Sequence, residues 1–177
     1  MKLFFILLKI LTMIDTVKKE FKRRIIDEGL SRTVKCVGEL SDEQLWYKHN
    51  SNTNSIGNII LHLCGNVRQY IQTGIGKQED IRNRPLEFLL SSRVDRKILI
   101  GKILDVVNEA NAVIQNLTES ELNEDREVQG FDENVLSIII HVIEHFSYHV
   151  GQITFFTKFV NDLDTGYYAG LDLDVTG

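Results

Sequence analysis

The sequence predicts an all-α protein, and more narrowly a four-helix bundle. Four long segments carry apolar side chains at the three- and four-residue spacing of amphipathic helices, and no segment shows the alternation of a half-buried strand. The chain has 177 residues, enough for one domain with a single core and too few for two ordinary domains. We therefore expect four helices around one core.

The first helix is predicted over residues 14–37. In this segment Phe21, Ile25 and Leu30 alternate with Lys and Arg, as expected for one buried and one solvated face. A Ser-x-x-Gln pattern beginning at Ser41 is typical of a capping box, in which two side chains bond to free backbone N–H groups. A short helix is therefore expected directly after it.

The second helix is predicted from Ser55, its N-cap, to residue 74 or 76. A charged connector follows over residues 76–93. It contains Pro85, the only proline of the chain, and is predicted as a loop for that reason. The third helix is predicted over residues 95–117.

The fourth helix, the longest and most apolar, is predicted over residues 133–160. The preceding connector, 118–132, begins with a Thr-x-x-Glu pattern that predicts one extra helical turn. The bundle domain is expected to span residues 13–168, with a flexible acidic tail over 169–177. Residues 1–12 are expected to be a weak signal-like segment or an extension upstream of a natural start at the second methionine.

Charge and cysteine content exclude several classes of function. The formal net charge is −5 and no dense block of Lys and Arg occurs, so nucleic acid is not an expected partner. The apolar run near the N-terminus is too short to cross a bilayer, so no membrane contact is expected. Cys36 and Cys64 have no C-x-x-C spacing and lie in apolar helical segments, which favours buried free thiols over a disulfide and fits a reducing cytoplasm.

The second helix carries an uncharged polar stripe beside its apolar face. At 100° per residue, this stripe lies about 120° from the centre of the apolar one. A solvated face would normally carry Lys and Glu, yet between residues 55 and 76 the only charged residue is Arg68, which lies elsewhere on the helix. Uncharged hydrogen-bonding groups suit a semi-enclosed cavity. The stripe consists of Ser55, Asn58, His62, Asn66 and Gln69.

The fourth helix repeats this pattern with histidines at four-residue spacing. Successive side chains at that spacing are only about 40° apart, so the histidines share one stripe. Glu144 is the only formally charged residue between positions 134 and 157. The stripe consists of Asn134, Ser137, His141, His145, His149 and Gln152, with Tyr148 at its edge.

These two stripes predict a metal site if they line one cavity. Two imidazoles one turn apart can reach the same ion, and His62 is favoured over His49 as a third ligand because it lies in a helix. Three imidazoles with an open fourth position form the ligand set of catalytic zinc sites. The alternatives are an amphipathic helix that presents histidines to water, or core histidines bonded to carbonyl groups.

Two other metal templates fit less well. Di-iron bundles need Glu-x-x-His pairs, and apolar residues stand three positions before every histidine of the two stripes. The sequence HVIEH over 141–145 matches the H-x-x-E-H pattern of inverted zinc proteases, in which Glu144 would activate water. A match of five residues is weak evidence. The template that fits best combines His145 and His149 with His62.

The segments SIGNIILHLCGN over 55–66 and QGFD to HVGQ over 129–152 resemble the DinB/YfiT-like superfamily of metalloenzymes. More narrowly, they are similar to its branch defined only as a domain of unknown function. The resemblance covers residues 13–168, and its most specific part is H-x-x-x-H followed by x-Gly-Gln. It implies that His62, His145 and His149 are the metal ligands and that His141 is a neighbour. From their places on or beside the two polar stripes, His141, Asn58, Asn66, Glu144, Tyr148 and Gln152 are expected to line the pocket or to contact the ligands.

The resemblance also implies an activity. Members of the superfamily include metal-dependent transferases that use low-molecular-weight thiols, so the chain is expected to bind zinc, nickel or iron and to transfer a thiol to a small electrophile. A metal-dependent hydrolase is the alternative, and a non-catalytic metal- or ligand-binding bundle in a stress response is a further one. Catalytic residues beyond the ligands are not assigned.

A homodimer is also expected. Relatives in the superfamily often form homodimers, and apolar residues on the fourth helix cover a wider arc than one bundle contact requires. A two-fold symmetric dimer would cover the rest of this arc. The arc consists of Leu136, Ile139, Ile140, Ile143, Phe146 and Val150.

Overall fold

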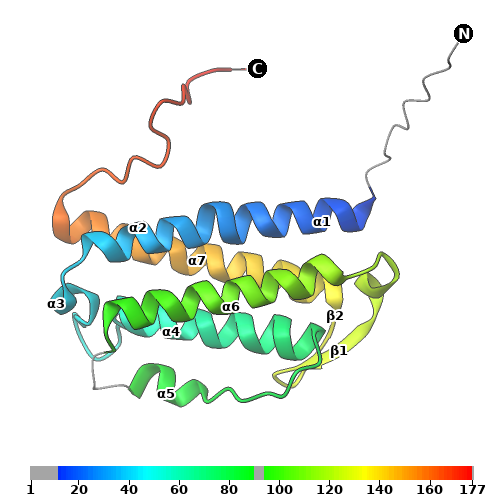
Figure 1. Cartoon of the computed structure of the whole chain (residues 1–177). Coiled ribbons are helices and arrows are strands. Elements are labelled where there is room, and N and C mark those ends of the chain that lie inside the picture. Colours follow the sequence, from blue (N-terminus) through cyan, green and yellow to red (C-terminus); the bar gives the residue numbers. More distant parts are fainter. Residues whose placement is uncertain (1–11, 90–93, 177) are drawn as a thin grey trace, which may run out of the picture.

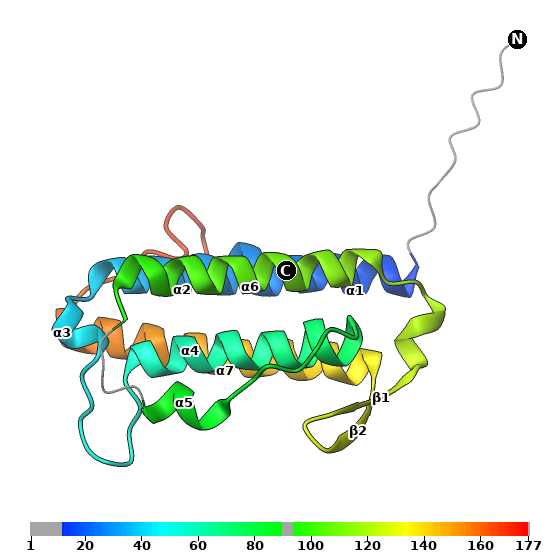
Figure 2. The same cartoon turned by 60° about the horizontal axis from the view of Figure 1, so that its bottom comes forward.

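The computed structural model describes residues 12–89 and 94–176 and confirms the predicted four-helix bundle (Figures 1 and 2). Four long helical segments run side by side along the molecule and enclose the core. The first and second each continue from an α-helix into a π-helical stretch. The segments are α1 Met13–Phe21 with η1 Lys22–Leu30 and α2 Ser31–Glu39, α4 Ile56–Val67 with η2 Arg68–Ile75, α6 Arg96–Asn116, and α7 Val135–Asn161.

The helices begin where the sequence supplies caps. The Ser55 hydroxyl accepts a hydrogen bond from the backbone N–H of Asn58, as predicted. Ser41 and Gln44 form the predicted capping box of the short helix α3 Asp42–Leu45. Helix α7 begins two residues later than predicted. Asn134 is its N-cap and lies outside the helix, and its side-chain oxygen accepts a hydrogen bond from the backbone N–H of Ser137.

The core lies between the four long helices and is mostly apolar, with a few fully buried polar residues such as Gln72 and Thr157. Phe21 and Leu63 are fully buried, and Phe146 is 1% exposed. The apolar arc of α7 is mostly covered by the bundle itself: Ile139 and Val150 are buried, and only Ile140 is clearly exposed. Most of the surface that motivated a dimer is therefore already packed within one chain.

A β-hairpin precedes α7, although the sequence showed no strand pattern. Strands β1 Asp125–Val128 and β2 Phe131–Asn134 pair antiparallel, with Val128 opposite Phe131. The connecting residues, Gln129 and Gly130, both have positive φ angles (55° and 80°). Two such residues form the tight turn that suits a two-residue hairpin, and glycine adopts this conformation without steric cost. The absence of strands was a wrong prediction because these strands are short and mostly exposed.

The connector predicted as a loop contains a helix, α5 Arg84–Leu89, which lies against α4 outside the bundle (Figure 2). Pro85 is in its first turn, where a missing N–H costs nothing, so the proline does not prevent the helix. The extra turn expected after α6 is also present, as the 3₁₀ turn η3 Ser120–Asn123. Thr118, which precedes this turn, donates a hydrogen bond from its hydroxyl to the Glu121 carboxylate.

The ends of the chain differ in how much can be described. Residues 1–11, which make up nearly all of the predicted extension, lie outside the described residues. Between residues 162 and 176 the chain forms no helix or strand, but Tyr167 packs back on the bundle, its hydroxyl 2.9 Å from the Cys36 sulfur. Both cysteines are free; Cys36 is buried, as predicted, and Cys64 is half-buried. Among the described residues, no helix is long and apolar enough to cross a membrane.

Candidate metal centre

Three histidines from two helices converge beside the core. One potential ligand nitrogen of each of His62, His145 and His149 lies within 4.8 Å of those of the other two. The Nε2 atoms of His62 (α4) and His145 (α7) are 3.1 Å apart. The structure thus brings together the three residues that the sequence singled out.

The spacing of the first two nitrogens suits a tetrahedral ion. Zn–N bonds of about 2.0–2.1 Å at the tetrahedral angle place two ligand nitrogens about 3.3–3.4 Å apart. The 3.1 Å separation between His62 and His145 is close to that value. The ring of His149 meets the rings of His62 and His145 edge to face. Its centroid lies 5.2 Å from that of His62 and 4.6 Å from that of His145.

The outer nitrogen of His62 is held by a buried carboxylate. Its Nδ1 lies 2.8 Å from Oε2 of Glu87 in α5. Burial raises the pKa of Glu87, but hydrogen bonds from His62 and Arg82 outweigh it, so this pKa lies below its usual value. An ionised carboxylate can only accept, so Nδ1 carries the proton and the lone pair of His62 is on Nε2, toward the other histidines.

Glu87 is in turn fixed by Arg82, which lies in the chain just before α5. The Arg82 Nε and Nη2 atoms donate to the two carboxylate oxygens at 2.7 and 3.0 Å. Its Nη1 donates to Gln69 of η2 at 2.8 Å. Both side chains are buried, with 4% of Arg82 and 9% of Glu87 exposed. Asn58 adds a hydrogen bond to the Glu87 backbone carbonyl. Carboxylate–histidine pairs of this kind orient the imidazole at metal sites.

His149 is oriented by its own helix. The Gln152 side-chain oxygen accepts from Nδ1 of His149 at 2.8 Å. Nε2 of His149 therefore keeps its lone pair for a ligand. Gln152, predicted as a pocket residue, has a definite role in fixing this ring.

His145 is the most deeply perturbed member of the cluster. Burial, together with the neighbouring His149 and His62, lowers the pKa of His145 to about 3. Burial also lowers the pKa of His149. Among the described residues, Nδ1 of His145 is buried without a hydrogen-bond partner. His145 thus differs from His62 and His149, whose outer nitrogens each have a hydrogen-bond partner that orients the ring.

The other predicted site residues lie around the cluster. His141 is not part of it: its ring stacks on Tyr70 with centroids 4.3 Å apart, and its Nε2 is 3.5 Å from Asn66 Nδ2. Tyr148 is exposed and touches His149 edge to face. Glu144 is exposed on the outer face of α7.

Two cavities meet at the cluster. One, of about 450 Å³, is lined by His149 and Gln152 together with aromatic residues such as Tyr47 and Phe156. The other, of about 410 Å³, is lined by His62 and His145, with polar residues from η2, the hairpin and the Arg82 segment. The histidines form the boundary between them.

Sequence reasoning missed Arg82 and Glu87, which lie in the connector predicted as loop. The available signal was indirect. A stripe of buried, uncharged polar residues on α4 needs a covering segment, and the charged connector is next in sequence. Burial confirms that this stripe is covered, because His62 is 8% exposed and Asn58 only 1%.

The chain is thus an all-α bundle in which three histidines from two helices lie close together. Residues 13–167 match the family described as "Protein of unknown function (DUF1572)", and the chain belongs to that family. No curated protein matches the chain in sequence.

Two solved structures show the same fold. A DinB-like protein from Bacillus cereus ATCC 10987 matches with a TM-score of 0.63 at 17% identity, covering 80% of this chain and 91% of that one. The DinB-like protein YjoA from Bacillus subtilis matches with a TM-score of 0.62 at 13% identity, covering 84% and 94%. At such identities the likeness concerns the fold alone.

Proposed function

We propose that this chain is a metal-dependent enzyme in which His62, His145 and His149 hold one divalent ion, zinc, nickel or iron. The observation that carries the proposal is the convergence of their nitrogens within 4.8 Å. Glu87 and Gln152 support it, because each fixes the outer nitrogen of one ring and leaves the inner lone pair free. When bound, an ion with three imidazole ligands keeps one position open and can lower the pKa of a thiol or water there.

The preferred reaction is thiol transfer to a small electrophile. Two separate cavities of similar size meet at the histidines, which suits two organic substrates better than one substrate and water. Burial keeps His145 and His149 neutral at neutral pH, so no proton has to leave them before a ligand binds. The Phe88 ring, with its centroid 5.2 Å from that of His62, adds an apolar contact to this ring.

A metal-dependent hydrolase is the second candidate. The exposed position of Glu144, on the outer face of α7, weighs against its acting as the water-activating base of an H-x-x-E-H site. The third candidate, a non-catalytic metal- or ligand-binding bundle in a stress response, requires the same histidines and no turnover.

An activity panel separates these candidates. Protein without an affinity tag is loaded with zinc, nickel or iron and offered small electrophiles with and without cysteine or glutathione, and esters without thiol. We expect thiol-dependent consumption of an electrophile that stops in a His149→Ala variant. Ester cleavage without thiol would favour the hydrolase, and no turnover by metal-loaded protein would favour the binding bundle.

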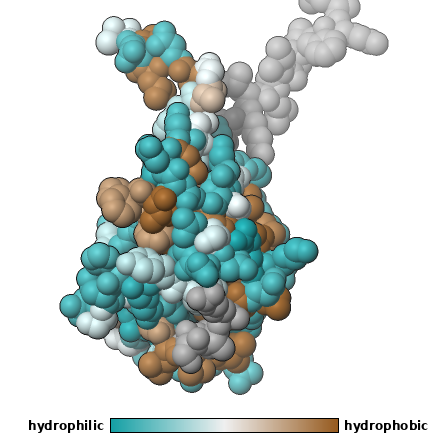
Figure 3. All heavy atoms as spheres, turned by 90° about the vertical axis from the view of Figure 1, so that its left-hand side faces the viewer, coloured by the Kyte–Doolittle hydropathy of each residue, from teal (hydrophilic) through white to brown (hydrophobic). Residues whose placement is uncertain are grey.

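We further propose a cytoplasmic homodimer. The two free cysteines support a reducing compartment. Exposed aromatic residues near the end of α7 support self-association: Phe155 and Phe159 are 71% and 76% exposed and stack on each other. Hydrophobic side chains interrupt the hydrophilic surface at this end of the bundle (Figure 3). Such a patch is costly in an isolated bundle.

A further inference from the structure

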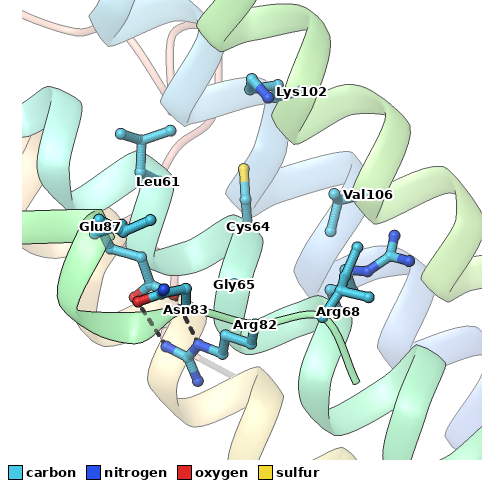
Figure 4. A pocket seen from close by; sticks show the side chains of 11 residues that line it. Leu61, Cys64, Gly65, Arg68, Arg82, Asn83, Glu87, Lys102 and Val106 are labelled. Atoms are coloured by element: carbon cyan, nitrogen blue, oxygen red, sulfur yellow. Dashed lines mark hydrogen bonds and ion pairs between the residues drawn. The ribbon is translucent and has the colours of Figure 1, made fainter. Parts of the chain in front are cut away.

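A third cavity, which none of the clustered histidines lines, lies beside the Arg82–Glu87 pair (Figure 4). Its volume is about 370 Å³, and its walls come from α4, α6 and the chain around α5. Glu87 and Arg82 lie together at one side of it, while Arg68 lines it from η2 and Lys102 from α6. The cavity is therefore distinct from the two that meet at the histidines.

The charges at this cavity are unbalanced. Three cations, Arg68, Arg82 and Lys102, line it together with a single carboxylate, Glu87. Glu87 is already bound by Arg82 on both of its oxygens. The remaining positive charge is notable in a chain with a formal net charge of −5.

The two remaining cations are poorly paired. Within the described part of the chain, Lys102 forms no salt bridge, and Arg68 reaches only Glu109, at 3.9 Å. The Arg68 Nε atom is buried and has no hydrogen-bond partner there. The nearby Asp80 carboxylate is occupied by the Gln69 amide and the Arg82 backbone N–H. Because this Nε atom is covered by protein, a ligand in the cavity would meet the terminal nitrogens of Arg68 and the Lys102 ammonium, which are the hydrogen-bond donors that an anionic ligand needs.

The rest of the wall is apolar. Leu61 and Val106 face the cavity from α4 and α6, and the exposed side chains Ile81 (63%) and Leu86 (53%) form its outer rim. Burial raises the pKa of Cys64 to about 12, so its thiol stays neutral and serves as a further weakly polar wall rather than a nucleophile. A hydrocarbon group placed here would cover surface that is otherwise exposed to water.

We propose that this cavity binds a small amphipathic carboxylate, with its anionic group at Arg68 and Lys102 and its hydrocarbon body against Leu61, Leu86 and Val106. A carboxylate accepts the bidentate hydrogen bonds that a guanidinium offers, and the apolar wall accounts for the hydrocarbon part. This binding site does not depend on whether the histidine cluster holds a metal.

Calorimetric titration of the full chain with octanoate tests the proposal. We expect octanoate to bind at least tenfold more tightly than 1-octanol or octylamine, which share its chain but not its charge. Affinity should rise roughly tenfold from hexanoate to octanoate, because each added methylene buries apolar surface. Inorganic phosphate should compete weakly. Phosphate binding as tight as octanoate binding, or equal binding of octylamine, would overturn the proposal.

Variants locate the site. Arg68→Gln combined with Lys102→Gln should weaken octanoate binding at least tenfold, while Lys97→Gln, an exposed lysine on the same helix, should not change it. Lys102 is exposed, so the single variant Lys102→Gln should fold normally. A loss of octanoate affinity in this variant would therefore not be a folding defect. A carboxylate can also bind to a metal ion, so the His149→Ala variant serves as a control. We expect it to bind octanoate with unchanged affinity, because the proposed site is the cavity. If octanoate binding were lost in His149→Ala but kept in the double variant, octanoate would bind at the histidines, and this would contradict the proposal. The absence of any octanoate binding up to about 10 mM would contradict it as well.

Discussion

The Nδ1–H of His62 donates to the Glu87 carboxylate at 2.8 Å, linking the second helix of the bundle to the short helix α5 that covers it. This bond sets the tautomer of His62 and points its free nitrogen at His145, 3.1 Å away. Arg82 keeps the carboxylate ionised and in place. The covering segment is thus a structural part of the proposed metal centre.

The first prediction follows from this bond. Glu87→Gln keeps the shape of the side chain but removes the charge, and we expect metal affinity to fall about 10- to 100-fold, as at other sites that lose the carboxylate behind a ligating histidine. A competition titration against a zinc-binding dye measures it. Glu144→Gln is the matched control because Glu144 is next to His145 in sequence yet exposed. Equal affinity of both variants would show that Glu87 does not support the ligand.

Gly65 tests the same relationship through packing. A Cβ atom at this position would clash with Oε1 of Glu87, whose side chain cannot move without breaking its bonds to Arg82 and His62. We expect Gly65→Ala to lower the free energy of unfolding by about 1–3 kcal/mol and to weaken metal binding.

The control for Gly65→Ala is another helical glycine, Gly101, around which a Cβ would meet nothing within 4 Å. Gly101→Ala should raise the free energy of unfolding by about 0.5–1 kcal/mol, since alanine loses less conformational entropy on folding. Urea unfolding at neutral pH measures both variants. A Gly65→Ala protein as stable as Gly101→Ala would mean that Glu87 is not held as described.

A third prediction concerns pH. The pKa of His145 is about 3 in the folded chain and about 6.5 for an unfolded histidine. Below pH 6.5 the unfolded state therefore binds a proton that the folded state does not, so the stability of the metal-free protein should fall as pH drops from 6.5 toward 3. Urea midpoints over this range should fall less steeply for His145→Gln than for the parent protein. Parallel curves would contradict the buried, neutral state of His145.

The fourth prediction concerns assembly. If Phe155 and Phe159 form the dimer contact, replacing both with serine should weaken dimerisation at least tenfold. Ile98→Ser, at an exposed position on α6, should leave it unchanged. Sedimentation equilibrium at micromolar concentration measures the mass, and a value near 20.3 kDa for the parent protein throughout would mean that the chain is a monomer.

The parts of this molecule that were predictable from sequence are those encoded within one helix. The four-residue spacing of His145 and His149 and the uncharged stripe around His62 indicated a shared site, because helical geometry converts spacing into direction. Glu87 was not predictable, since its partner is 25 positions away and its segment follows no helical period. The hairpin before α7 depends on the local turn at Gly130, which outweighs the low strand propensity of its charged neighbours.

Metal content of three proteins tests the central claim most directly. The parent chain, His149→Ala and His141→Ala, all without affinity tags, are incubated with zinc, separated from free ion and analysed by mass spectrometry for metal per chain. We predict one ion per chain in the parent and in His141→Ala, because His141 stacks on Tyr70 outside the cluster, and almost none in His149→Ala. Full metal content in His149→Ala, or none in the parent protein, would contradict the proposed site.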